Sequence, residues 1–207
     1  MKDKLRAKVP SLRKISSGRE LNHYFNLSGN LETVFDEVSP LIPKGKKSAL
    51  QKIMKEGQKI SIRTRQALGK TLFIIKASVG DDTSANGVSR IEFEAEVQKT
   101  LDELDKVLLG AGLTYQAKWS RDREEYENKD HRMHITIDRN AGYGYVAEFE
   151  KMANLSKDVQ KIEKEIRDFM ADLGIEELSQ DRLERMFAHY NHHWRDYYGT
   201  DKVFNIK

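Results

Sequence analysis

Hydrophobic and charged residues alternate along residues 90–97. Successive side chains of a β-strand point to opposite faces, so this segment has one apolar face and one charged face. The apolar face comprises Ile91, Phe93, Ala95 and Val97, and the charged face Arg90, Glu92, Glu94 and Glu96. The pattern predicts a strand that places its apolar face on a core.

Other segments have strand-like patterns and are separated by turn residues. Leu68-Gly69-Lys70 predicts a tight hairpin. Strands are predicted at residues 19–27, 59–65, 71–76, 89–97, 113–127, 132–139 and 145–150. Residues 4–9 fit either a further strand, which Pro10 would end, or a helical turn.

Several segments have the apolar spacing of amphipathic helices. Helices are predicted over residues 31–38, 100–109 and 154–173, and from Ser179 or Asp181 to Trp194 or Tyr198. Residues 47–57 fit either a short helix or a long loop. Residues 80–88 are polar and predict a flexible loop.

The helices decide which way the charged strand faces point. Each amphipathic helix must cover an apolar surface, and the apolar faces of the strands can supply it. If the helices lie outside, the charged faces line a water-filled barrel or cleft. The alternative is that each charged face is a solvated sheet surface with cross-strand ion pairs.

The side chains that would line this cleft are of both signs. Carboxylates two residues apart on a strand can share one metal ion, and arginines offer planar donors to phosphate oxygens. A lining of this kind suits a metal-bound polyanion, with Mg²⁺ or Mn²⁺ on the carboxylates. The basic candidates are Arg63, Arg65, Lys76, Arg90, Arg121 and Arg123, and the acidic ones are Glu92, Glu94, Asp138, Glu148 and Glu150.

Composition narrows the class of protein. The chain has 207 residues, 33% of them charged, a net charge of +3 and no cysteine, which excludes disulfides and thiolate zinc sites. Mean hydropathy is −0.71, no apolar run is long enough to span a membrane, and the start lacks the apolar region of a signal peptide. Basic residues do not interleave with aromatics, so we expect neither nucleic acid nor membrane as a partner, and a soluble cytoplasmic protein.

Six short segments, in this order, resemble the CYTH superfamily of triphosphate tunnel metalloenzymes and class IV adenylate cyclases. The resemblance covers roughly residues 19–151. The segments are Ile62-Arg63-Thr-Arg65, Phe73-Ile-Ile-Lys76, Arg90-Ile-Glu92-Phe-Glu94, Arg121-Asp-Arg123-Glu-Glu-Tyr126, Ile137-Asp138-Arg139 and Gly144-Tyr-Val-Ala-Glu148-Phe-Glu150.

The resemblance implies an α+β fold: an antiparallel eight-stranded β-barrel, or triphosphate tunnel, with helices packed outside. The tunnel domain would span residues 1–151, with the C-terminal helices of residues 152–207 packed on it. The ligand would be tripolyphosphate, ATP or thiamine triphosphate. The implied phosphate-binding residues are Lys8, Arg63, Arg65, Lys76, Arg90, Arg121 and Arg123; the implied metal ligands are Glu148, Glu150 and Glu94; the implied catalytic or water-orienting residues are Glu92, Glu94 and Asp138.

One departure concerns the first strand, which in this family carries Glu-x-Glu-x-Lys and binds metal. Its best match here is Lys4-Leu-Arg6-Ala-Lys8, which keeps the lysine and replaces both glutamates. Either this is the altered strand or the strand is missing. We also expect His23-Tyr24-Phe25 to belong to the strand that follows the family's first helix.

Four functions follow as hypotheses. The first is a divalent-metal-dependent triphosphatase that hydrolyses the terminal phosphoanhydride. The second is a class IV-type adenylate cyclase making cyclic AMP, suggested by Tyr24-Phe25 and Gly112-Leu-Thr. The third is a non-catalytic polyphosphate- or nucleotide-binding module, and an RNA-binding module is the weakest. The sequence leaves the oligomeric state open, with a homodimer as one option. His189 and His193 are four residues apart on a helix, and packing is the favoured role for them.

Overall fold

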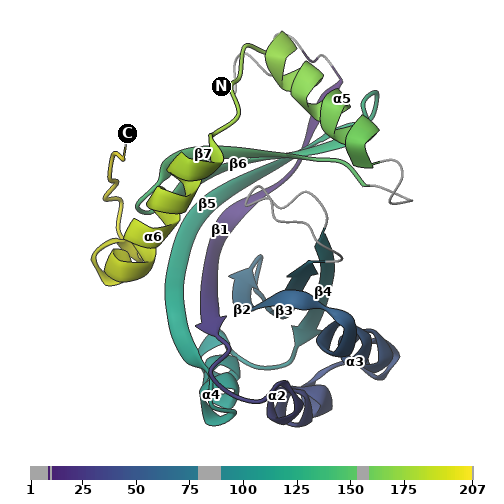
Figure 1. The fold of residues 1–207 in the computed structure, drawn as a ribbon, viewed down its shortest axis with the longest axis vertical. Coiled ribbons are helices and arrows are strands. Elements are labelled where there is room, and N and C mark those ends of the chain that lie inside the picture. The colour runs from purple at the N-terminus through teal and green to yellow at the C-terminus, as the bar shows by residue number, and fades with distance from the viewer. Residues whose placement is uncertain (1–8, 10, 79–89, 153–158, 207) are drawn as a thin grey trace.

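The computed structural model describes residues 9, 11–78, 90–152 and 159–206. The described strands form one seven-stranded sheet with the order β4-β3-β2-β1-β5-β6-β7, and all neighbours are antiparallel. Figure 1 shows β1 and β5 curving together along the molecule. The strands are β1 (Leu12–Asn26), β2 (Gln58–Ala67), β3 (Lys70–Ser78), β4 (Arg90–Val97), β5 (Thr114–Asn128), β6 (Met133–Asn140) and β7 (Gly144–Glu150).

The α+β class and the antiparallel sheet are confirmed, whereas the closed eight-stranded barrel is not. Within the described residues, β4 and β7 are the two edges of the sheet and do not pair with each other. The predicted eighth strand, residues 4–9, falls almost entirely outside the described residues. Closure requires the two edge strands to exchange backbone hydrogen bonds, and the described sheet leaves them apart.

Most predicted elements are present. The helices are α2 (Leu31–Val38), α3 (Lys47–Glu56), α4 (Leu101–Gly110), α5 (Val159–Asp172) and α6 (Gln180–Tyr197). The open choice at residues 47–57 is therefore resolved as a helix. Thr100 and Glu103 form a capping box at the start of α4, and the Ser179 side chain caps α6. Strand β1 begins at Leu12, earlier than expected.

The hairpin between β2 and β3 follows from its two turn residues. Leu68 and Gly69 both have positive φ, 49° and 77°, which a two-residue turn between twisted antiparallel strands requires. This turn sets the register of β2 against β3, with Arg65 opposite Leu72 and Arg63 opposite Ile74. The register in turn fixes which side chains share a face.

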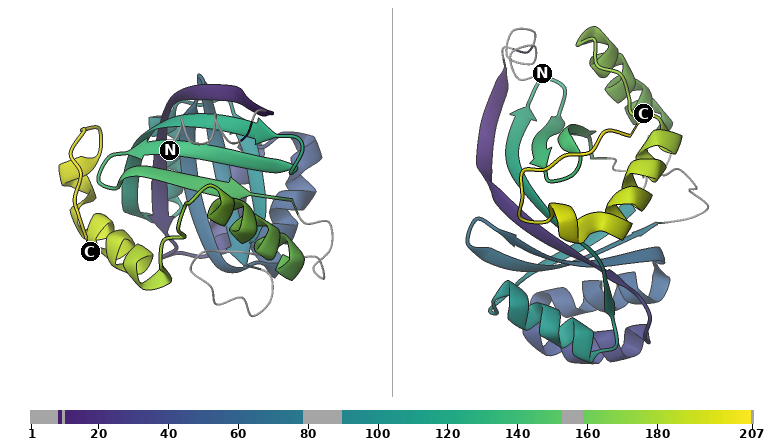
Figure 2. Two further views of the ribbon diagram at one scale, coloured as in Figure 1. Left: turned by 90° about the horizontal axis from the view of Figure 1, so that it is seen from above. Right: turned by 90° about the vertical axis from the view of Figure 1, so that its left-hand side faces the viewer.

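The larger apolar core lies between one face of the sheet and the helices α2, α3 and α4. Phe73, Ile75, Phe93 and Ala95 from the strands meet Leu104 and other residues of the helices there. Figure 2 shows these helices grouped on one side of β2 and β3, away from α5 and α6. The prediction that helices cover the apolar strand faces is confirmed for this half of the sheet.

The two C-terminal helices contact the other half of the sheet. Phe169 of α5 packs with Tyr126 of β5 and Ile135 of β6. Helix α6 lies along the part of β5 that extends beyond its pairing with β6: Tyr190 Oη donates to the Lys118 carbonyl at 2.8 Å. An unpaired strand edge that is covered in this way cannot recruit another strand.

Candidate functional site

The strand register gathers the charged side chains on the face opposite the main core. On β1, Glu20, Asn22 and Tyr24 alternate with Leu21 and residues of the core side. Tyr24 lies opposite Arg63, Asn22 opposite Arg65, and Glu20 opposite Arg121. Because side chains of directly opposed residues point the same way, these six share one face.

The remaining strands extend this face in both directions. Lys76 of β3 lies opposite Glu92 of β4, and Arg123 of β5 opposite Asp138 of β6. Glu94 of β4 lies opposite Ile74 of β3, which lies opposite Arg63 of β2. On β7, Glu148 lies opposite Thr136 and Glu150 opposite His134 of β6. We call this curved charged surface the bore. The predicted residues that it brings together are Arg63, Arg65, Lys76, Glu92, Glu94, Arg121, Arg123, Asp138, Glu148 and Glu150.

Two predicted members cannot be placed. Lys8 and the rest of Lys4-Leu-Arg6-Ala-Lys8 lie outside the described residues, as does the side chain of Arg90. Their roles stay predictions.

Alternating charges form a ladder across the middle of the bore. Glu20 lies 3.8 Å from Arg65 and 2.7 Å from Arg121. Arg121 also contacts Asp138 at 2.9 Å, and Arg123 donates to both carboxylate oxygens of Asp138, at 2.8 and 2.7 Å. Such charges can be buried because each is hydrogen-bonded to an opposite charge, which offsets part of the cost of removing it from water.

The surrounding charges favour the ionised forms of Glu20, Glu148 and Arg123. Burial raises the pKa of Glu20, but the nearby guanidinium groups of Arg121, Arg65 and Arg123 outweigh it and hold that pKa below its usual value. The same balance lowers the pKa of Glu148, where desolvation is opposed by Arg123, Arg121 and Lys76. Burial lowers the pKa of Arg123, but hydrogen bonding to Asp138 and the charges of Glu148 and Asp138 raise it by more, so the net shift of this pKa is upward. These groups carry full charge at neutral pH.

Arg63 differs from the other arginines of the bore. It is 8% exposed, and its Nη1 donates to Tyr24 Oη at 3.0 Å. Its Nε has no hydrogen-bond partner, and no carboxylate of the described residues forms an ion pair with it. A buried cation without an anion is costly, so this side chain is suited to binding an anion.

Tyr24 shows that the walls of the bore converge. Burial raises its pKa, but Arg63, Arg121 and Arg65 lower it further, while the charge of Glu148 acts to raise it. Side chains from β1, β2, β5 and β7 therefore lie within electrostatic range of one hydroxyl. The strand register places Arg63, Arg121 and Glu148, which were predicted to converge, on one face of the sheet, and their roles stay predictions.

Carboxylates on the two edge strands are more accessible than those in the ladder. The side chains of Glu92 and Glu94 on β4 are 38% and 45% exposed, and those of Glu148 and Glu150 on β7 are 46% and 58% exposed. No three acidic or histidine residues of the described chain lie close enough to hold a metal by themselves. Mg²⁺ commonly takes one or two carboxylates together with ligand phosphates, which these residues can provide.

Asp138 is placed differently from these exposed carboxylates. Its side chain is 2% exposed and accepts hydrogen bonds from Arg121 and Arg123. The contacts position the two arginines. Its predicted catalytic role is untested.

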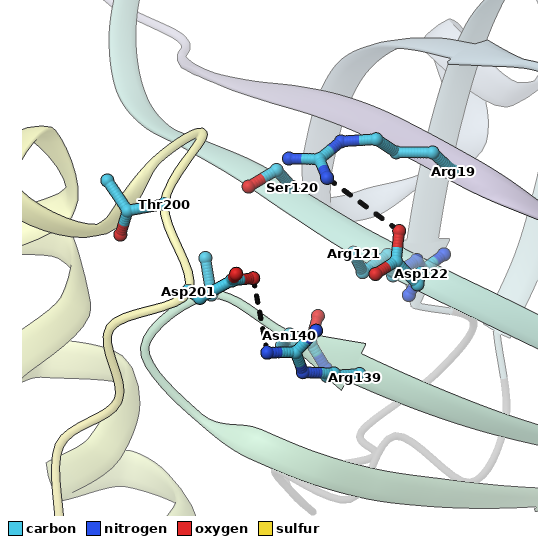
Figure 3. Close-up of a pocket in the computed structure, with 9 residues that line it drawn as sticks. Arg19, Ser120, Arg121, Asp122, Arg139, Asn140, Thr200 and Asp201 are labelled. Atoms are coloured by element: carbon cyan, nitrogen blue, oxygen red, sulfur yellow. Dashed lines mark ion pairs between the residues drawn. The ribbon is translucent and has the colours of Figure 1, made fainter.

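A small hollow beside the bore is lined by residues of β1, β5, β6 and the C-terminal segment, Arg121 among them. Figure 3 shows it bordered by the ion pairs Arg19–Asp122 at 3.8 Å and Arg139–Asp201 at 3.2 Å. Its space of about 10 Å³ admits about one water molecule. It is too small for a polyphosphate.

Sequence reasoning assigned no binding or catalytic role to four residues of the bore: Glu20, Asn22, Tyr24 and Trp119. Trp119 lies opposite Asn22. The missed signal was the spacing Glu20-x-Asn22-x-Tyr24, which has the period of a strand face and lies on the first described strand of the sheet. The strand precedes helix α2, and residues 1–8, which would have to test the expectation that a first helix comes before it, lie outside the described residues.

His189 and His193 are in packing contacts. Their rings are 4.7 Å apart, and His189 also packs edge-on against Phe204 at 4.7 Å. His193 Nδ1 lies 3.7 Å from Asp196. They belong to no metal cluster of the described residues. None of the helices in the described part of the chain is long and apolar enough to cross a bilayer.

Comparisons with known proteins fit this geometry. The structure resembles PH1819 from Pyrococcus horikoshii (TM-score 0.61, 18% identity, covering 88% of this chain and 94% of that one). It also resembles PH1012 from the same organism (TM-score 0.59, 17% identity, 85% and 84% covered). A candidate adenylate cyclase from Vibrio parahaemolyticus matches with TM-score 0.56 and 14% identity, over 89% and 88% of the two chains.

These likenesses, at low identity, show the fold. No curated protein matches the chain. The family model of the CYTH domain matches residues 51–183, more than half of the sequence. The chain therefore belongs to the CYTH domain family.

Proposed function

We propose that the bore binds the triphosphate group of an inorganic or organic triphosphate. The observation that carries this proposal is Arg63, a buried cation that has no anionic partner among the described residues. Arg65, Arg121 and Arg123 line the same face. Planar guanidinium donors match phosphate oxygens, and a bound anion would supply the missing charge.

The position of the acidic residues favours a divalent metal as a second component. The exposed carboxylates of Glu148 and Glu150 on β7, with Glu92 and Glu94 on β4, would hold Mg²⁺ or Mn²⁺ jointly with phosphate oxygens. When bound, the metal would neutralise charge on the transferring phosphoryl group. The arginines of the ladder would orient the phosphates and stabilise the charge that develops on them.

The reaction that we propose is hydrolysis of the terminal phosphoanhydride. Cyclisation of ATP is the second candidate, supported by the fold that the chain shares with the candidate Vibrio adenylate cyclase. Binding without turnover is the third. All three share the same binding site, so the binding assay comes first.

The test is calorimetric titration with tripolyphosphate, ATP and thiamine triphosphate, each with Mg²⁺, with Mn²⁺ and with a chelator. Phosphate release and cyclic AMP are measured in the same samples. Phosphate release supports hydrolysis, cyclic AMP supports cyclisation, and binding alone supports a ligand-binding module. Absence of binding for every ligand under every condition would refute the proposal.

A further inference from the structure

A buried carboxylate joins helix α4 to three strands on the face of the sheet opposite the bore. Asp105 of α4 is 1% exposed. It accepts hydrogen bonds from His23 Nδ1 at 2.6 Å, from Thr64 Oγ1 at 2.6 Å and from Tyr115 Oη at 2.7 Å. These donors belong to β1, β2 and β5, which are neighbours in the sheet. One carboxylate therefore ties three adjacent strands to a single point of α4.

The charge of Asp105 fixes the direction of these hydrogen bonds. Burial raises the pKa of Asp105, but the three hydrogen bonds that it accepts lower this pKa further, so the group is ionised at neutral pH. An ionised carboxylate only accepts, so the Nδ1 atom of His23 carries the hydrogen and donates. The Tyr198 hydroxyl lies 2.7 Å from Nε2 of the same ring. Both nitrogens of His23 are thus held in place.

His23 and Thr64 lie directly behind residues of the bore. They are opposed in the register of β1 and β2, and they are 2% and 0% exposed. Because successive side chains of a strand alternate between faces, the residues before and after each of them point into the bore. Two opposed pairs of bore residues therefore flank the pair that Asp105 holds. They are Tyr24 with Arg63 and Asn22 with Arg65.

Arg63 depends most on this alignment. In the bore, Glu20 and Asp138 hold Arg121 from two sides, whereas no carboxylate of the described residues forms an ion pair with Arg63. Its Nη1 donates to Tyr24 Oη at 3.0 Å, across the junction of β1 and β2. The place of this guanidinium relative to the rest of the bore is consequently set by how β1 lies against β2.

Stability alone does not account for a carboxylate at this position. Apolar side chains of similar shape can replace a buried hydrogen-bonded network at little or no cost in stability. What a fully satisfied network adds is one preferred arrangement of its members. Hydrogen bonds of 2.6 Å from Asp105 to both His23 and Thr64 resist any slide of one strand against the other.

We propose that Asp105 is a positioning residue of the bore. Through His23 and Thr64 it fixes the alignment of β1 and β2 that places Arg63 for the triphosphate. The proposal rests on the function proposed above, and it adds a residue that touches no ligand. It predicts that ligand affinity depends on a hydrogen bond on the opposite face of the sheet from the ligand.

Two substitutions of Thr64 in the full chain separate positioning from stability. Thr64→Val keeps the shape of the side chain but removes the hydroxyl that donates to Asp105, and Thr64→Ser keeps that hydroxyl but removes a buried methyl group. Urea unfolding measures the stability of both variants, and calorimetry with tripolyphosphate measures binding to the folded chain. We expect Thr64→Val to bind at least about 5-fold more weakly and Thr64→Ser to bind within about 2-fold of the unmodified chain.

The matched control is Ser120→Ala. Ser120 is 2% exposed and lies on β5 between Trp119 and Arg121 of the bore. Its hydroxyl accepts a hydrogen bond from the Gly199 N–H at 2.9 Å, so the variant also loses a buried hydrogen bond behind the bore. Because this bond does not involve Asp105, Ser120→Ala should bind tripolyphosphate as the unmodified chain does.

The outcomes decide between positioning and a purely structural role. Unchanged affinity in folded Thr64→Val would overturn the proposal, as would an equal loss of affinity in Thr64→Ser or Ser120→Ala. If Thr64→Val does not fold, Tyr115→Phe removes a different donor to the same carboxylate and is judged by the same criterion. Failure of tripolyphosphate to bind the unmodified chain would instead refute the proposed function, and the positioning role with it.

Discussion

Replacing Arg63 by methionine should weaken ligand binding without destabilising the protein. Methionine keeps much of the side-chain volume and removes the charge. The natural residue is buried, and its Nε has no hydrogen-bond partner among the described residues. The matched change is Arg123→Met in the same bore, where the guanidinium donates to both oxygens of Asp138 and to Glu148 at 3.2 Å.

The expected changes in the free energy of unfolding differ because the guanidinium groups of Arg63 and Arg123 have different partners. At Arg63, relief of an unpaired buried donor recovers about 1–3 kcal/mol. Loss of the bond to Tyr24 and of the contact with its ring, 4.5 Å away, costs about 1–2 kcal/mol. The free energy of unfolding should therefore fall by no more than about 1 kcal/mol and can rise by up to about 2 kcal/mol.

At Arg123, removal of one partner of a buried ion pair costs about 3–5 kcal/mol. The lower end applies, because Arg121 still donates to Asp138 at 2.9 Å. A loss of about 3 kcal/mol lowers the melting temperature by roughly 6–12 °C in a chain of this length.

Urea unfolding followed by circular dichroism measures both variants, and calorimetry with tripolyphosphate measures binding. We expect Arg63→Met to be about as stable as the unmodified chain or more stable, and to bind at least about 10-fold more weakly. If Arg63→Met is as unstable as Arg123→Met, then Arg63 is a structural residue and the argument from its missing anion is wrong.

Further changes probe other parts of the molecule. The pKa of Glu20 is lower in the folded chain, so its contribution to stability is full above about pH 4.5 and is lost as the pH falls through the folded pKa. Melting temperatures measured from pH 7 to 3 should therefore fall less steeply with decreasing pH in Glu20→Gln than in the unmodified chain. An unchanged slope would contradict this. If the chain hydrolyses triphosphate, Glu148→Gln should lower metal-dependent phosphate release by at least about 100-fold. The control variant Glu96→Gln, which removes a carboxylate paired with Lys70, should leave the rate of phosphate release unchanged. Asp105→Asn should lower the free energy of unfolding by about 2–3 kcal/mol, measured with urea, because the buried carboxylate accepts hydrogen bonds from His23, Thr64 and Tyr115. A loss below about 0.5 kcal/mol would show that a neutral amide can replace the carboxylate at this position.

Much of the bore was predictable because strand alternation is a local property. The alternation at residues 90–97 and the pair Arg63-x-Arg65 specify which side chains share a face before any partner strand is known. The amphipathic helices supplied the second constraint, since their apolar sides had to cover the apolar faces of the strands. Together these two patterns place the basic and acidic side chains on the inner face.

Strand β1 shows where local pattern was insufficient. Glu20-x-Asn22-x-Tyr24 contains one charge, one amide and one phenol, so its charged face is not evident from composition. Its place became clear only from its pairing with both β2 and β5. The expected Lys4-Leu-Arg6-Ala-Lys8 strand lies outside the described residues, and Glu20 of β1 forms ion pairs with arginines of the ladder.

The sequence by itself determined the strands and helices, the inward direction of the charged residues and the family, because each depends on side-chain periodicity and short motifs. Only the tertiary structure decided that Asp138 is held by two arginines, that Arg63 has no anionic partner among the described residues, and that Tyr190 of α6 stacks on Trp119. These facts depend on contacts between residues distant in sequence. Such contacts are set by strand order and register, which no local pattern encodes.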